Sequence, residues 1–275
     1  MRAMPGFRAH LRCVAENWRP RETEDDRMSR SLRDLGRFVA GLWALFLDTT
    51  PGGITLARMG DILELTGVSG VGRARSLMIY LQFIGFIEPD SAARDGRVRV
   101  FRPTTGMKAA LLEHYRREFA GLECLDADLA ASLASINDPD RLAVFVGSLA
   151  ELTLAALQLR GPDDDPGLDA VSHRHAGMMV LGDLLVTAAT DDSPFPPVGP
   201  VRFSVAGLAR RCGISRTQLR RIIKAGEDAG FFIDRGEGEV VLTEHLALHL
   251  EMLSAGVYLI HREAQTLSLK AGLRD

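Results

Sequence analysis

The stretch that decides the fold is ISRTQLRRIIKAGEDAGFFI, residues 214–233. Serine is a good N-cap, so Ser215 predicts the start of a helix over 215–229. Successive residues of a helix are about 100° apart, and small or apolar residues then share one face. We expect this face to lie against a core, and it carries Leu219, Ile222, Gly226 and Ala229.

The opposite face of the same helix is polar and basic. A helix that carries arginine on its outer face can contact phosphates or the edges of guanine bases. An ordinary solvated face is the competing interpretation. The outer face carries Arg216, Thr217, Arg220, Arg221 and Lys224, and Gln218 lies at its boundary.

A second stretch, VSGVGRARSLMIYLQFIGFI at 68–87, repeats this pattern. A glycine-centred turn precedes the helix in each copy, at Gly67 and Gly213, and a Gly-Phe pair ends it. The two copies lie about 145 residues apart, which indicates a duplicated domain rather than a solenoid.

Each copy predicts the same order of elements. An apolar helix is followed by an extended entry, a short helix, the glycine turn, the longer helix and a hairpin. In the first copy we expect a helix at 29–48, the entry at 54–56, a helix at 59–65, and strands at 86–88 and 98–101 with a tip at 95–96. In the second copy we expect a helix at 168–190, the entry at 203–205, a helix at 206–211, and strands at 231–234 and 239–242 with a tip at 236–238.

This order resembles the winged helix-turn-helix, and the additional long helices are similar to the MarR group of regulators. The resemblance implies a mainly α fold with small β-hairpin wings, in which tandem winged-helix domains are joined by long helices. It implies double-stranded DNA as the partner. It also allows a homodimer and a small-molecule effector, which no residue identifies. The expected domains are a leader at 1–28, winged-helix domains at 29–122 and 168–275, and a helical connection with an acidic linker at 123–167.

Charge is distributed unevenly along the chain. The net charge is −3, yet residues 201–224 hold seven basic residues and no acidic one. Residues 121–200 hold three basic and thirteen acidic residues. Screening limits the reach of such fields, so a basic surface in the second copy can attract phosphate although the whole chain is acidic.

The first copy offers a different set of candidates for DNA contact. Its helix carries Arg73 and Arg75, and its hairpin carries Arg94, Arg97 and Arg99 within the arginine-rich wing 94–102. The second wing, 235–239, is acidic and a poor phosphate binder. We therefore expect helix-led contact in the second copy and wing-led contact in the first.

Other functions find less support. A protein-interaction scaffold and a replication initiator are the alternatives to a transcriptional regulator, and the acidic segment 121–200 favours the scaffold. We expect neither an enzyme nor a cofactor, because no catalytic or phosphate-binding motif occurs. His245 and His249 lie four apart without a third metal ligand. Three separated cysteines, no secretory signal and no long apolar run predict a cytoplasmic protein without membrane contact.

Overall fold

The computed structural model describes residues 4, 6–19, 31, 35–66, 71–91, 98–134, 136–137, 139–158, 168–190 and 194–271. The described chain is mainly helical and carries two small antiparallel sheets, as expected. No helix among these residues is both long and apolar enough to cross a bilayer. The chain divides into two compact units, one of 1–34, 117–131 and 165–258, and one of 35–116, 132–164 and 259–275.

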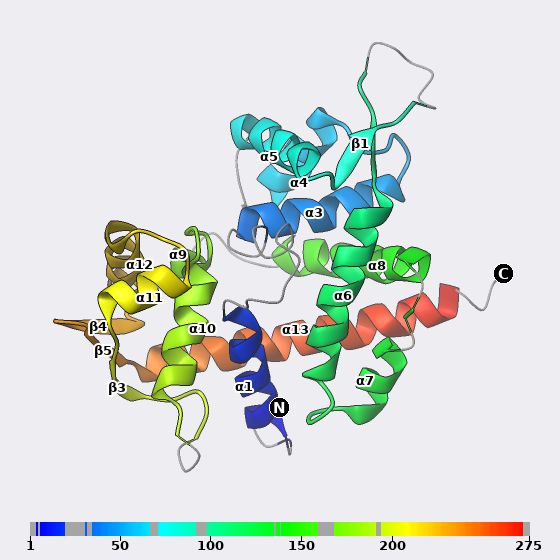
Figure 1. The fold of residues 1–275 in the computed structure, drawn as a ribbon. Coiled ribbons are helices and arrows are strands. Elements are labelled where there is room, and N and C mark those ends of the chain that lie inside the picture. Colours follow the sequence, from blue (N-terminus) through cyan, green and yellow to red (C-terminus); the bar gives the residue numbers. More distant parts are fainter. Residues whose placement is uncertain are drawn as a thin grey trace. The chain divides into compact units, whose positions relative to one another are not determined.

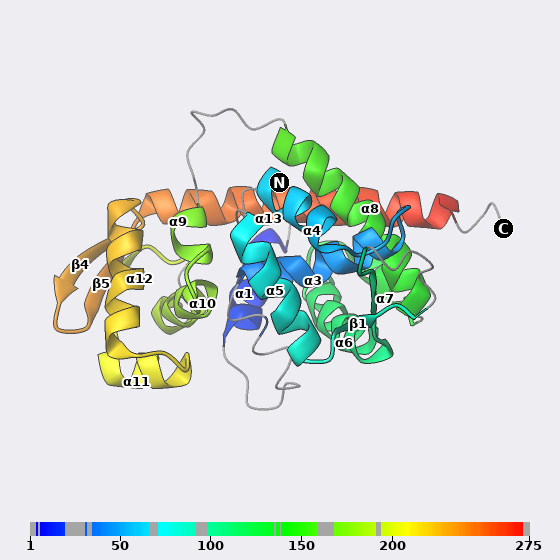
Figure 2. The same cartoon turned by 90° about the horizontal axis from the view of Figure 1, so that it is seen from above.

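The first unit contains the second sequence copy together with the N-terminal helix. Its strands follow the order β3-β5-β4, with β5 antiparallel to both neighbours. Figures 1 and 2 show α11 and α12 crossing, with the β4–β5 hairpin beside α12. The elements are α1 (Phe7–Trp18), α9 (Asp169–Ser172), α10 (Gly177–Ala188), β3 (Gly199–Arg202), α11 (Val205–Arg211), α12 (Arg216–Asp228), β4 (Phe232–Gly236), β5 (Glu239–Leu242) and the first part of α13 (Glu244–Ala271).

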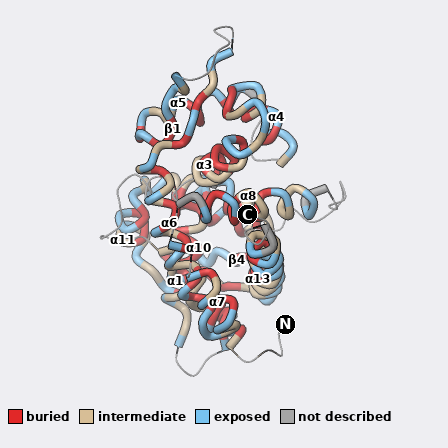
Figure 3. The backbone as a smooth tube through the Cα atoms, turned by 90° about the vertical axis from the view of Figure 1, so that its right-hand side faces the viewer, coloured by how far each residue is buried: buried red, intermediate tan, exposed pale blue. Residues whose placement is uncertain are grey.

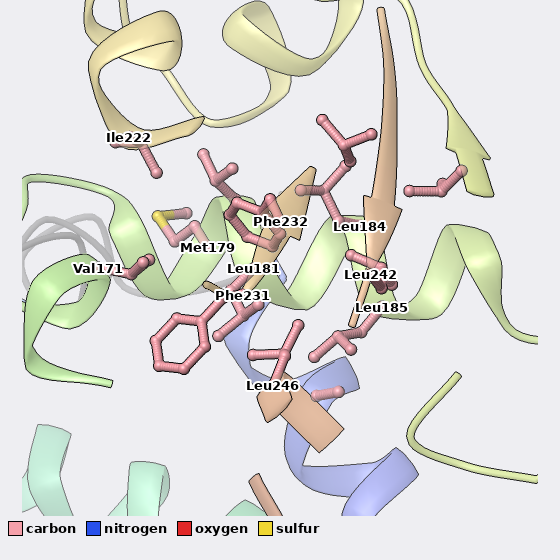
Figure 4. Close-up of a cluster of buried hydrophobic side chains, with 14 of the residues drawn as sticks. Val171, Met179, Leu181, Leu184, Leu185, Ile222, Phe231, Phe232, Leu242 and Leu246 are labelled. Carbon is pink, nitrogen blue, oxygen red and sulfur yellow. The ribbon is translucent and has the colours of Figure 1, made fainter. Parts of the chain in front are cut away.

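One apolar cluster forms the core of this unit. Phe231 and Phe232, at the start of the hairpin, are each 1% exposed and lie among side chains of α10 and α12 (Figure 4). Phe7, Leu11 and Ala15 of α1 belong to the same cluster. The leader expected at 1–28 is therefore partly a packed helix of this unit.

Helix α1 approaches α10 closely at Gly182. A Cβ atom on Gly182 would lie 2.7 Å from the Ala15 carbonyl oxygen and 2.9 Å from Trp18 Cβ, so only glycine fits without a shift. The next residue, Asp183, is a carboxylate with a 1% exposed side chain. Arg211 Nε donates to Asp183 Oδ1 at 3.1 Å, and Arg19 Nε lies 3.5 Å from the same oxygen. Asp183 thus joins α1, α10 and α11.

Replacing Asp183 by Asn should lower the free energy of unfolding by about 1–3 kcal/mol, because it removes a buried charge that two guanidinium groups bind. The exposed pair of Asp228 with Lys224, at 2.9 Å, provides a matched control. Asp228→Asn should cost much less than Asp183→Asn, since solvent screens that pair. Urea unfolding of the two variants compares the effects. Equal losses would contradict a structural role for Asp183.

The second unit contains the first sequence copy. Strand β1 pairs antiparallel with β2, with Glu88 opposite Arg102, and α3 packs against α4, α5 and α8. Buried and exposed positions alternate around α4 and α5 (Figure 3). The elements are α3 (Leu35–Asp48), α4 (Leu56–Leu65), α5 (Val71–Phe83), β1 (Ile87–Pro89), β2 (Phe101–Pro103), α8 (Pro139–Gln158), and parts of α6 (Thr105–Ala120), α7 (Ala127–Ala134) and α13.

The two copies share local hydrogen bonds as well as sequence. Gly85 and Gly230 end α5 and α12 with φ of 72° and 74°. Thr104 Oγ1 donates to the Gly85 carbonyl at 2.7 Å, and Thr243 Oγ1 donates to the Gly230 carbonyl at 2.8 Å. In both copies the backbone N–H of the following phenylalanine donates to a carbonyl five residues earlier, at 2.8 Å. These matched helix ends support the duplication.

The extended entry predicted at 203–205 is wrong in position, and the one predicted at 54–56 is reduced to a single bridging residue. Thr55 and Ser204 are the N-caps of α4 and α11, and their hydroxyls accept from the backbone N–H groups of Arg58 and Gly207. Because the helix begins directly after its N-cap residue, the strand of the second copy lies before Ser204, at Gly199–Arg202. In the first copy, Ile54 makes only an isolated bridge with Phe101.

The predicted helix at 168–190 is interrupted. Its residues form α9 and α10, separated by a turn in which Ala176 has a φ of 63°. A Cβ on Gly177 would lie 1.8 Å from the Val171 carbonyl oxygen, so the chain folds back closely at this glycine. In the first hairpin, the second strand begins at Phe101 rather than at residue 98. Hairpin tip 95–96 and turn residue Gly67 lie outside the described residues.

Candidate nucleic-acid interface

Local sequence fixes where α12 begins. Gly213 ends the preceding turn with a φ of 64°, a conformation that suits glycine. Ser215 Oγ accepts from the Gln218 backbone N–H at 3.1 Å, which confirms the predicted N-cap. The turn and the cap together place Arg216 as the first residue of the helix.

The inner face of α12 is held by the core. Leu219 and Ile222 are 1% and 0% exposed, as their spacing predicted, and Gly226 is buried with them. A Cβ on Gly226 would lie 2.2 Å from two carbons of the Phe232 ring, so the helix rests directly on the hairpin. This contact gives the outer face of α12 a rigid support.

The outer face of α12 is exposed and basic. Arg216, Arg220 and Arg221 are exposed, and within the described part of the chain none of them has an acidic partner. Their guanidinium groups are therefore available to an external anion. Thr217 is exposed beside them, and Gln218 is partly buried.

Lys224 differs from these arginines. Its ammonium nitrogen lies 2.9 Å from Asp228 Oδ1 and 3.0 Å from Glu227 Oε2, one turn further along the helix. Hydrogen bonds to Asp228 and then to Glu227 raise the pKa of Lys224. Its charge is thus neutralised within the helix, and the basic face is concentrated in the first half of α12.

Arg210 is a further candidate that the sequence analysis did not single out. It lies in the last turn of α11, is exposed, and has no acidic partner among the residues that the structure describes. Its only sequence signal is its place in the basic run 201–224. The neighbouring Arg211 is bound to Asp183 instead.

The β4–β5 hairpin carries acidic residues at and beside its tip. Its turn contains Gly236, Glu237 and Gly238, all with positive φ. Arg202 of β3 lies opposite Glu239 of β5, and its Nε donates to Glu239 Oε2 at 2.7 Å, which neutralises this arginine. The hairpin therefore contributes little positive potential beside α12.

In the first copy, α5 presents a mixed face. Arg73 and Arg75 are exposed, as a DNA-contacting helix requires. Ile79 and Phe83 on the same helix are also exposed, by 58% and 80%. A repeat of about 145 residues aligns these two apolar residues with Lys224 and Asp228 of α12. The corresponding helices therefore carry different chemistry.

The structure describes only part of the first wing. Arg94 and Arg97 lie outside the described residues. Arg99 is exposed, and its guanidinium carbon lies 5.1 Å from the centre of the Phe101 ring. Arg102 Nε donates to Glu88 Oε1 at 2.9 Å, so this arginine is paired across the hairpin.

His245 and His249, which were considered as metal ligands, pack their rings against Phe231 of the core. Their ring centroids are 4.3 Å apart and lie 5.4 and 5.3 Å from that of Phe231. Among the described residues, no three His, Cys, Asp or Glu side chains are grouped closely enough to hold a metal.

No family model, curated protein or solved structure significantly matches this chain.

Proposed function

We propose that residues 177–242 form a winged helix-turn-helix that binds double-stranded DNA, and that the protein is a transcriptional regulator. The order of α10, β3, α11, α12 and the β4–β5 hairpin is the order of that motif. The observation that carries the proposal is the outer face of α12. It presents arginines without acidic partners in the described chain, on a helix whose opposite face is locked into a core.

The proposed chemistry follows from the guanidinium group. Arg216 and Arg220 project from one face of α12, one turn apart, and each can donate two hydrogen bonds to guanine O6 and N7 in the major groove. Arg210 and Arg221 lie on either side of the α11–α12 turn in sequence and suit contacts with phosphate oxygens, which position the helix on the duplex.

A salt titration tests this proposal directly. Affinity for a labelled duplex, measured by fluorescence anisotropy between about 50 and 200 mM salt, should fall steeply because each neutralised phosphate releases counterions. The two arginines assigned to phosphates, Arg210 and Arg221, predict a slope of about −2 in log affinity against log salt, at about −0.9 for each phosphate. A flat response, or no binding at low salt, would contradict DNA binding.

A protein-interaction scaffold is the second candidate, and one observation favours it for the first copy. Ile79 and Phe83 expose apolar surface on α5, where a DNA-binding helix needs polar groups. Exposed aromatic side chains are typical of protein-binding surfaces. A flat salt response of the whole chain would favour this function over DNA binding.

A further inference from the structure

The N-terminal helix meets the turn that follows α6 through one of its faces. Gly6 precedes α1 with a φ of 82°, and a Cβ on it would lie 1.6 Å from the Cys124 carbonyl oxygen. His10 Nδ1 lies 2.8 Å from the Gly121 carbonyl oxygen, and His10 is 3% exposed. Residues 6, 10 and 13 follow the i, i+4, i+7 spacing of a single helix face.

The third residue of that face brings two thiols together. The two thiols lie near enough to influence each other's ionisation, and burial is the largest cause that raises the pKa of Cys13 and of Cys124. Cys13 Cβ lies 3.3 Å from the point where a Cβ on Gly121 would stand, and Cys124 Sγ donates to the Gly121 carbonyl oxygen at 3.5 Å. Both cysteines therefore contact the same glycine residue.

The two cysteines differ in access. Cys124 is exposed, Cys13 is partly buried, and the third cysteine, Cys212, is 0% exposed in the core. An external reagent can therefore reach Cys124, while Cys13 is positioned to react with whatever forms there. Nothing in the proposed DNA contact uses either residue.

We propose that Cys13 and Cys124 are a redox-active dithiol that forms a reversible intramolecular disulfide by exchange with small-molecule disulfides. In the first step the Cys124 thiolate attacks one sulfur of the small disulfide, which gives a mixed disulfide and releases one small thiolate. In the second step the Cys13 thiolate attacks Cys124 Sγ, forms the Cys13–Cys124 bond and releases the second small thiolate. The two protons lost by the cysteines pass to the released thiolates, and the two electrons lost by the protein reduce the small disulfide.

The bond would tie α1 to the turn at 121–125. Helix α1 packs in the same core as α10. Arg19, which directly follows α1, contacts Asp183. A crosslink between α1 and this turn restricts the unfolded chain, so the oxidised protein should melt at a higher temperature than the reduced protein.

Equilibration of the intact protein in glutathione buffers of varied redox ratio tests the dithiol. Peptide mass spectrometry after acid trapping should detect a peptide pair joined through Cys13 and Cys124. Free thiols should fall from three to one, and dithiothreitol should restore them. The Cys212→Ala variant should form the same bond. Cys13→Ser should instead accumulate glutathione on Cys124, because the resolving thiol is missing.

Two results would overturn the proposal. One is a wild-type protein that carries only a mixed disulfide on Cys124 at every redox ratio. The other is a protein that retains all three thiols when a surface-exposed control thiol is fully oxidised. The melting temperature gives an independent measurement. It should be higher for the oxidised than for the reduced wild-type protein, and this difference should be absent in Cys13→Ser, which cannot form the bond.

Discussion

The double substitution Arg216→Ala and Arg220→Ala should weaken binding to duplex DNA by at least about tenfold and by up to several powers of ten. A bidentate contact between arginine and guanine contributes about 1–3 kcal/mol, and about 1.4 kcal/mol corresponds to a factor of ten. Both residues are exposed on α12, and neither has an acidic partner within the described residues, so their loss removes no internal ion pair. Anisotropy titration at fixed salt measures the change.

Two controls separate the loss of contacts from the loss of fold. Arg235→Ala, in the wing, should leave the affinity close to that of the wild type, because Glu237 and Glu239 surround that position with negative charge. The double variant should keep its stability within about 0.5 kcal/mol, since exposed substitutions on a helix rarely cost more. A folded double variant with wild-type affinity would show that α12 does not bind DNA. The exposed Arg99 and the arginines at 94 and 97 would then be the next candidates.

Periodicity predicted α12 well because its contrast is strong. Arginine and lysine alternate with leucine and isoleucine at helical spacing. The structure has the helix begin at the predicted N-cap, Ser215, and end before the predicted glycine, Gly230. The hairpin of the second copy was also predicted within a residue or two, since glycines mark both sides of its tip. Local chemistry alone determines these elements.

Features that depend on distant residues were not predictable. The entry strand of the second copy pairs with β5, which lies more than one helix away in sequence, and its position is set by that partner rather than by its own residues. The packing of α1 beside α10 depends on the absence of a side chain at Gly182. No local pattern in 1–28 indicates this contact.

The candidate site shows the same division. The exposure of Arg216, Arg220 and Arg221 follows from spacing, because it is the geometric complement of the buried face. The sequence shows two acidic residues at i+3 and i+4 from Lys224, so this pairing could have been predicted. It was missed because residues 201–224 were treated as one basic segment that ends at Lys224. The burial of Asp183 beneath Arg211 joins residues far apart in the chain and required the structure.

Gly226→Ala should lower the free energy of unfolding by about 1–3 kcal/mol, which is the usual cost of forcing extra atoms into a packed core. The expected sign is informative, because the same substitution inside a helix normally stabilises by about 0.5–1 kcal/mol. Here the new methyl group would lie 2.2 Å from two ring carbons of Phe232, which is 1% exposed and belongs to the apolar core cluster. Urea unfolding measures the loss.

Gly256 provides the matched control for this prediction. It lies within α13, and a Cβ on it meets nothing within 4 Å, so Gly256→Ala should stabilise the protein by up to about 1 kcal/mol. The first copy indicates how the clash can be relieved. The repeat aligns Gly226 and Phe232 with Leu81 and Ile87, so a larger residue on the helix accompanies a smaller residue on the strand.

A double-mutant cycle therefore tests whether the two positions share one volume. Phe232→Leu alone should destabilise the protein by leaving a cavity, whereas in the Gly226→Ala background it should restore part of the lost stability. The coupling between the two substitutions should then be favourable. Additive losses would mean that the helix yields to the methyl group elsewhere. In that case α12 rests less firmly on the hairpin than the contact between Gly226 and Phe232 indicates.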